Sequence, residues 1–486
     1  MAASTILLII VCYFALLFSI AWVTSRKAGS NAYFLGNKQS PWYAVAFGLI
    51  GDSLSGVTFV SVPGAVGAGQ FGYMQIVLGY VVGYFVIAQV LLPLYYRLNL
   101  TSIYSYLGQR LGGSSQKTGS AFFILSRLVG AAFRLYISAT VLQLFIFNQW
   151  NVPFAVTVSI VIILILLYTY KGGIKTLVWT DTLQSSFLLA GVLLSIIAIA
   201  SALNLNFGEL VSTVHNSEMS KIFFWEWQEK NYFFKQFFSG ALIAIVMTGL
   251  DQNMMQKNLS MRTLPEAQKN IRWFSVIVVI VNLFFVSLGV LLFEYSNSMQ
   301  IEIPTKTDHL FPMLALDHLG MFAAIVFVLG ITAATFSSAD SVLTTLTTSF
   351  YIDILGKKTE LETEKNKNTR HIIHIGFAVL LLIVIILFEA VMTDTVINAV
   401  FTVAGYTYGP LLGLFAFGIL TKRSVQNTFV PFACIIPPVF CYFLNKNSAS
   451  WLGGYQVGYE LLFINGLLTF ILLFIISRQP EKQISL

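Results

Sequence analysis

The chain has 486 residues, of which 57% are hydrophobic and only 10% are charged. A soluble globular domain carries a much larger share of charged residues, so this composition excludes that class and predicts a polytopic membrane protein. The net charge of +7 does not indicate nucleic-acid binding, because the basic residues lie along short connections between apolar segments and form no basic domain.

Apolar segments follow one another along nearly the whole chain. A membrane-crossing helix needs roughly 20 mostly apolar residues, and this criterion predicts about 13 spans. They lie at approximately 4–24, 41–66, 74–96, 119–147, 153–170, 177–202, 236–256, 271–295, 319–350, 371–391, 396–420, 424–444 and 456–477. We therefore expect an all-α protein that crosses the membrane many times.

The distribution of lysine and arginine predicts the orientation of the chain. An odd number of spans places the two termini on opposite sides of the membrane. With the N-terminus outside, the inward connections hold about 21 of the 28 basic residues, which is the positive-inside pattern. These connections are 25–40, 97–118, 171–176, 257–272, 351–370, 421–423 and the tail. We expect a multi-pass cell-membrane protein with a cytoplasmic C-terminus, and the compact tail favours a bacterial inner membrane.

The sequence contains no convincing signature of an enzyme. The segment "GAGQFG" (67–72) matches the spacing of a dinucleotide-binding loop, but no strand precedes it and no βαβ unit surrounds it. The five histidines and three cysteines have no catalytic or metal-ligand spacing. We therefore predict that the protein is not an enzyme.

Carboxylates at membrane depth are the informative residues, because each costs roughly 2.5 to 3.5 kcal/mol to insert and must be compensated. The candidates are Asp52, Asp181, Asp251 and Asp340. Asp251 lies near the inward end of its span, where an interfacial position is a sufficient explanation. Asp52 lies in "GLIGDSLSGVTFVSVPGAV", whose glycines and proline favour either an unwound segment with carbonyl ligands for a cation or a close helix contact.

The apolar segment at 319–350 carries an unusual group of hydroxyls in "TFSSADSVLTT". Ser337 and Ser338 each share a helix face with Ser341, and Asp340 is adjacent. The hydroxyls could simply bond back to the preceding helical turn. The nearby carboxylate favours a second interpretation, in which these oxygens bind Na⁺.

Five motifs occur in an order that resembles the sodium:solute symporter family. They are "YFLGNK", "TSIYSYLGQRLGG", "YKGGIKTLVWTDTLQ", "LDQNMMQKNLSMRTLPEAQ" and the serine segment. The resemblance implies a LeuT-type fold of two inverted five-helix repeats, each beginning with a broken helix. The implied parts are an extra helix and loop (1–40), the first repeat (41–202), the second repeat (236–420), and C-terminal helices with a cytoplasmic tail (421–486).

The resemblance also implies sodium ligands. The site shared by the family corresponds to Gly51, Leu54, Ala334, Ser337 and Ser338 in this sequence. A second sodium site, found in sialic acid members, corresponds to Asp181, Asp340 and Ser341. This chain departs from the pattern by placing Asp340 where a hydroxyl is expected, so the second site could bind an ion or a proton. Alternatively, Asp181 and Asp340 could form ion pairs with Arg127 or Arg134.

Residues similar to the substrate ligands of sialic acid members complete the expected site. Ser53, Ser55 and Thr58 match hydroxyls of the broken helix. Arg127 and Arg134 are alternative partners for a substrate carboxylate, and Phe71 and Gln75 are the expected facing aromatic and amide. An intramembrane arginine suits a carboxylate better than a neutral sugar, because its planar group bonds a carboxylate through two N–H groups.

We therefore expect a Na⁺-coupled symporter that imports a small organic solute, with an acidic sugar such as sialic acid favoured. A neutral sugar, an amino acid, a monocarboxylate or a vitamin is the alternative solute. The alternatives from other classes are a sodium channel, which would need a continuous polar pore, and a membrane sensor, which would need a signalling domain.

Overall fold

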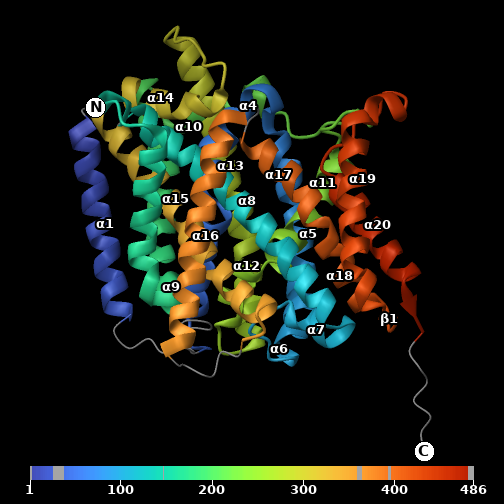
Figure 1. Cartoon of the computed structure of the whole chain (residues 1–486). Coiled ribbons are helices and arrows are strands. Elements are labelled where there is room, and N and C mark those ends of the chain that lie inside the picture. The colour runs from blue at the N-terminus through green and yellow to red at the C-terminus, as the bar shows by residue number, and fades with distance from the viewer. Residues whose placement is uncertain (1–2, 26–37, 146, 358–363, 392–395, 480–486) are drawn as a thin grey trace, which may run out of the picture.

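The computed structural model describes residues 3–25, 38–145, 147–357, 364–391 and 396–479. Most of these residues form helices, which run up and down one bundle in Figure 1. The strands within the described ranges, β1 (Ser424–Val425) and β2 (Ser477–Arg478), form one short antiparallel pair at the lower end of the bundle. The all-α fold class predicted from the sequence is confirmed.

The helices follow one another with short connections, as expected for a chain of membrane spans. Their bounds are α1 (Ala3–Ser25), α3 (Trp42–Ser53), α4 (Gly56–Gly69), α5 (Tyr73–Val86), α6 (Leu92–Arg97), α7 (Ser105–Leu111), α8 (Gly113–Phe145), α9 (Phe154–Ala202), α10 (Phe207–Asn216), α11 (Phe233–Ala244), α12 (Gln252–Leu259), α13 (Leu264–Ser298), α14 (Leu310–Met313), α15 (Gly320–Ser349), α16 (Glu364–Val391), α17 (Val396–Thr407), α18 (Gly409–Leu420), α19 (Val430–Trp451) and α20 (Leu461–Ile475).

Among the described residues, 8 helices are long and apolar enough to cross a membrane, and counting each bent helix pair as one span raises the number to 10. The number of 13 spans therefore stays a prediction. Residues 171–176, predicted as a connection, are helical in this structure and belong to α9. Two apolar stretches of α9, 154–167 and 176–202, nevertheless correspond to the two spans predicted there.

Two helices near the centre of the bundle are interrupted inside the protein. The first interruption separates α3 from α4 at Leu54 and Ser55, where the glycine-rich sequence predicted a break. The second separates the helical segment Phe233–Gly249 from α12, with a bend of 62°. Helix interruptions at membrane depth are tolerated where protein surrounds the backbone or where the backbone lines a cavity. Both breaks therefore identify the interior where a polar site is expected.

The helices α3, α9 and α15 pack against one another around the first break. Helix α15 makes its most extensive contact with α9, and α3 packs against both. Small residues permit this close arrangement, because a glycine offers no side chain to separate two backbones. The three helices thus bring the broken segment beside the serine-rich segment of α15, although they are far apart in the sequence.

A second close contact joins α5 to α11 through glycines on both helices. A Cβ atom on Gly79 would collide with the carbonyl oxygen of Phe237, and one on Gly240 would collide with the carbonyl oxygen of Ile76. The backbones therefore touch directly along this seam. Helix α5 carries one wall of the central cavity described below, so the seam fixes that wall to α11.

We expect Gly79→Ala to lower the stability of the protein by about 1–3 kcal/mol, because the added methyl group must push α5 away from α11. Thermal unfolding of the purified protein in detergent measures this effect. Gly130→Ala, also within a long helix, is the matched control, since a Cβ atom there meets nothing within 4 Å. Equal melting temperatures for both variants and the wild type would show that the helices are not in backbone contact.

Candidate functional site

The break between α3 and α4 frees backbone oxygens in the interior. Leu54 (φ −98°, ψ 76°) and Ser55 (φ −78°, ψ −178°) leave the helical conformation. Carbonyl groups in the last turn of a helix lack intrahelical donors, and the carbonyl of Asp52 accepts a hydrogen bond from Arg134 at 3.3 Å. Unwound carbonyl oxygens of this kind are suitable ligands for a small cation.

The residues predicted to form the shared sodium site come together from α3 and α15. A Cβ atom on Gly51 would lie 2.7 Å from the hydroxyl oxygen of Ser337, so the two residues are in direct contact. The Ser337 hydroxyl donates to the carboxylate of Asp181 at 3.4 Å. The backbone N–H of Gly51 donates to the hydroxyl of Ser185 at 2.9 Å, which joins α3 to α9.

The other predicted sodium ligands lie on the same two helices. Leu54 and Ala334 are buried. Thr335, which follows Ala334, lies 3.6 Å from the position of a Cβ on Gly56, so this part of α15 runs alongside the break. Ser338 and Asp340 lie in α15, but their side chains are outside the part of the structure that is described.

A central cavity opens beside the break and encloses about 700 Å³ of atom-free space, including its mouth. Five of the predicted substrate residues line it, namely Ser53, Ser55, Thr58, Arg127 and Arg134. Three tyrosines of α5 that were not predicted also line it, although Tyr73, Tyr80 and Tyr84 are spaced as one helix face.

The other two predicted substrate residues do not line this cavity. Phe71 is buried before α5 begins. The Gln75 amide donates to the carbonyl of Asn231 at 2.9 Å and accepts from the backbone N–H of Phe224 at 3.3 Å. Gln75 therefore holds the segment before α11 in place, and a role for Phe71 or Gln75 in substrate binding stays a prediction that this geometry does not favour.

The two arginines of α8 differ in their partners. Arg127 forms an ion pair with Asp251, with 3.6 Å between Nε and a carboxylate oxygen. Arg134 reaches the carbonyl of Asp52 and has no ion-pair partner among the described residues. Arg127 is therefore neutralised within the protein, whereas Arg134 presents a cation to the cavity.

The interpretation of Asp251 as an interfacial residue is wrong, because its side chain is completely buried. Its carboxylate caps α12 by accepting from the backbone N–H groups of Asn253 and Met254, at 2.9 and 3.2 Å. The Tyr408 hydroxyl also donates to it at 2.8 Å. The bend before α12 turns Asp251 inward, which apolar length alone does not predict.

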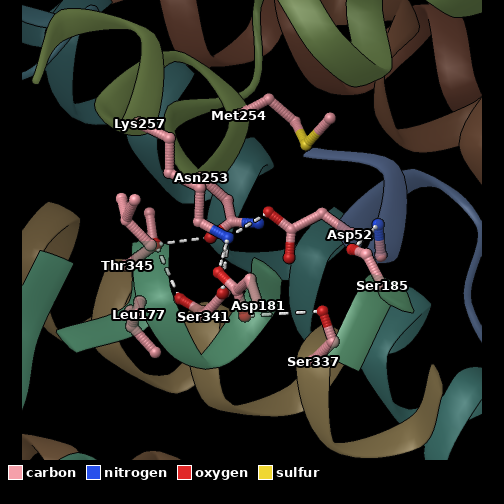
Figure 2. Close-up of polar contacts among 12 residues, drawn as sticks. Asp52, Leu177, Asp181, Ser185, Asn253, Met254, Lys257, Ser337, Ser341 and Thr345 are labelled. Atoms are coloured by element: carbon pink, nitrogen blue, oxygen red, sulfur yellow. Dashed lines mark hydrogen bonds and ion pairs between the residues drawn. The ribbon is translucent and has the colours of Figure 1, made fainter. Parts of the chain in front are cut away.

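Lys257 of α12 lies at the centre of a cluster that was not predicted (Figure 2). Its side chain is 1% exposed. The ammonium group donates to Asp52, to Asp181 at 2.5 Å and to Ser341 at 2.9 Å. The alternative that Asp181 pairs with Arg127 or Arg134 is therefore wrong, since its partner is Lys257.

Lys257 begins the predicted inward connection 257–272, and this placement is wrong for its side chain, which is buried. One feature of the sequence does indicate a buried cation. Asp52 and Asp181 were both expected at membrane depth, and two buried carboxylates need a buried cation. Helix α12 is short, polar and buried throughout, so its lysine has no route to the surface.

Comparisons with known proteins agree with this geometry. The model of the sodium:solute symporter family matches residues 33–428. The sodium/sialic acid symporter SiaT of Proteus mirabilis is 25% identical over 84% of this chain and 83% of its own length. The sodium/sialic acid symporter NanT of Aliivibrio fischeri is 25% identical over 83% of this chain and 80% of its own, and mouse sodium-coupled monocarboxylate transporter 1 is 25% identical over 89% and 70%.

Solved structures support the fold. A substrate-bound, outward-open Na⁺-coupled sialic acid symporter superposes with a TM-score of 0.82 at 21% identity, covering 98% of this chain and 99% of the other. The nucleobase-cation symporter Mhp1 in a closed conformation gives a TM-score of 0.53 at 13% identity, covering 92% and 94%. At these identities the likeness supports the fold alone, and the fold is of the LeuT type.

The bundle, the interrupted helices and the buried polar cavity define a secondary transporter of the membrane, not an enzyme. The chain belongs to the sodium:solute symporter family. It is therefore a multi-pass membrane protein whose substrates are Na⁺ and a small molecule. Na⁺ is a transported ion here, and no group of three or more His, Cys, Asp or Glu side chains suited to a resident metal occurs among the described residues.

We expect Arg127→Gln to destabilise the fold by about 3–5 kcal/mol, because it leaves the Asp251 carboxylate buried without its cation. The double variant Arg127→Gln with Asp251→Asn should recover much of this loss. Arg134→Gln, which breaks no ion pair, should change stability by only about 1 kcal/mol. Thermal unfolding of the four proteins checks these values, and an equal loss in both single variants would contradict the assignment of different roles.

Proposed function

We propose that this symporter imports an acidic sugar such as sialic acid together with Na⁺. The observation that carries the proposal is Arg134, a buried cation that lines the central cavity without an ion-pair partner among the described residues. An unpaired guanidinium group in such a site is costly, and a solute carboxylate would neutralise it through paired hydrogen bonds. Of the two arginines, Arg134 is therefore the better candidate for binding the solute carboxylate.

The remaining walls of the cavity suit a sugar. Ser53, Ser55 and Thr58 supply hydroxyl groups near Arg134. One carboxylate oxygen of Asp52 is buried without a hydrogen-bond partner, and this acceptor suits a sugar hydroxyl. The tyrosines of α5, which line the same cavity, offer flat apolar surfaces with polar ends.

The relatives narrow the choice of solute. Two of those described above are sodium/sialic acid symporters, and another is a monocarboxylate transporter. Both solute classes carry a carboxylate, which is the group that Arg134 favours. The several hydroxyl groups and the unpartnered oxygen of Asp52 favour the sugar acid, and a monocarboxylate is the second candidate.

Sodium coupling would arise at the contact between α3 and α15. Na⁺ bound by carbonyl oxygens of the break and hydroxyls of α15 would hold the two helices together and favour the outward-open state. The proposed ligands are Gly51, Leu54, Ala334, Ser337 and Ser338. Loss of the ion on the low-sodium side would release the contact and allow the core to open inward.

We further propose that the protein resides in a bacterial inner membrane with its N-terminus outside. Basic residues concentrated in the expected inward connections favour this orientation. In Figure 1, α1 begins at the upper end of the bundle and α20 finishes toward the lower end, which suits an odd number of spans.

Purified protein should bind N-acetylneuraminate, and Na⁺ should increase the affinity. Arg134→Gln should weaken binding at least about 100-fold, because the carboxylate loses a charged hydrogen-bonding partner worth roughly 3 kcal/mol. Isothermal titration with and without Na⁺ measures both effects. Arg134→Lys, which keeps the charge but not the planar geometry, should give an intermediate affinity. Unchanged affinity in Arg134→Gln would remove this arginine from the solute site, and tighter binding of a simple monocarboxylate would favour the second candidate.

Replacement of the two adjacent hydroxyls, Ser337→Ala with Ser338→Ala, should abolish sodium-stimulated uptake into proteoliposomes. The substitution removes two ion ligands but little volume, so the melting temperature without Na⁺ should stay close to that of the wild type. Ser186→Ala is the control, because Ser186 is exposed on α9 and bonds only back to Thr182 within its own helix. Normal sodium-stimulated uptake in the double variant would exclude this site from the mechanism.

A further inference from the structure

We infer that Lys257 is a built-in cation that fills the second cation site, so that this symporter binds a single Na⁺, at the shared site. The inference deepens the proposed sodium coupling and rests on it, but it does not depend on which solute is carried.

The geometry of the ammonium group is that of a bound ion. Lys257 is buried, and its three N–H donors face three oxygen acceptors, on Asp52, Asp181 and Ser341. These acceptors come from α3, α9 and α15, whereas Lys257 comes from α12. All three N–H donors of the ammonium group are therefore used in hydrogen bonds within this cluster.

The acceptors overlap with the residues expected to hold a second sodium ion. Asp181 and Ser341 belong to that expected set, and both bond to Lys257 (Figure 2). An ammonium group and Na⁺ carry the same charge and both associate with oxygen atoms, so they compete for one position. Because the lysine is covalently held, it occupies the position at any sodium concentration.

The two carboxylates that bond to Lys257 carry more charge than the one ammonium group between them. Asp52 and Asp181 carry two negative charges against the one positive charge of Lys257. The second oxygen of Asp181 accepts from Ser337, the hydroxyl of the shared sodium site. A sodium ion bound there would lie next to the Asp181 carboxylate. Of the other buried cations nearby, Arg127 pairs with Asp251, and Arg134 reaches only the backbone carbonyl of Asp52 and lines the solute cavity.

Two variants separate the charge of Lys257 from the space that it fills. Lys257→Ala removes both the ammonium and most of the side chain, which leaves two carboxylates around a space that an ion can enter. Lys257→Met removes the ammonium but keeps a side chain of similar length, so the space stays filled. A purely structural role for Lys257 would lower the stability of both variants without changing the number of ions bound.

The measurement is equilibrium binding of ²²Na⁺ to the purified protein, together with the sodium dependence of its melting temperature, without any solute. Because the Hill coefficient cannot exceed the number of sites, we expect no value above 1 for the wild type and Lys257→Met, whereas Lys257→Ala, with two sites, can exceed 1. At saturation, Lys257→Ala should bind about twice as much ²²Na⁺ as the wild type.

A wild-type protein that binds two sodium ions overturns the inference, even if neither variant folds. A folded Lys257→Ala that binds no more ²²Na⁺ than the wild type also overturns it. If only the proposed solute is wrong, the result is different: sodium binding follows the expected pattern, but N-acetylneuraminate does not bind. Absence of any sodium binding to the wild type would instead reject the coupling itself.

Discussion

A charge buried at membrane depth must have its counter-charge in the same place, and the arrangement of this protein depends on that requirement. Lys257 satisfies it for Asp52 and Asp181, while Arg127 and Asp251 satisfy it for each other. Because the partners come from different helices, each ion pair also fixes how those helices meet. Removal of one member leaves a buried charge, which costs much more than the intact pair contributes.

The two helix breaks make these pairings possible. At the first break, α3 ends and Asp52 follows Gly51 into the interior next to α9 and α15. At the second, the bend of 62° turns Asp251 and Lys257 toward the same interior. One carboxylate oxygen of Asp181 accepts from Lys257 and the other accepts from Ser337. A sodium ion bound at Ser337 would therefore act through Asp181 on Lys257 and α12.

Features that depend on local sequence were predictable. The glycines around Asp52 indicated the first break, the spacing of Ser337 and Ser341 indicated one polar helix face, and the apolar segments indicated the bundle. The structure brings Gly51 and Ser337 into contact as the sodium-site prediction requires, although ion binding itself stays a prediction. Each of these inferences uses residues within a few helical turns, where spacing alone determines which side chains share a face.

Features that depend on the path of the chain between helices were not predictable. Lys257 ends an apolar segment, and only the bend at Asp251 decides that it points inward instead of into water. The placement of Phe71 and Gln75 away from the cavity has a similar origin, because the turn at Gln70, with a positive φ of 51°, sets the register of α5. That turn directs Tyr73 and Tyr80 into the cavity and Gln75 toward Asn231.

The glycine seam between α5 and α11 has a mechanical consequence for transport. Where two backbones touch without intervening side chains, no rotamer change can absorb a sliding or twisting movement. We therefore expect α5 and α11 to move as one rigid body when the cavity changes the side on which it opens. The tyrosines that line the cavity would then move with α5, and the cavity would open by separation of α5 and α11 from Arg134 and α8, without distortion of α5 itself.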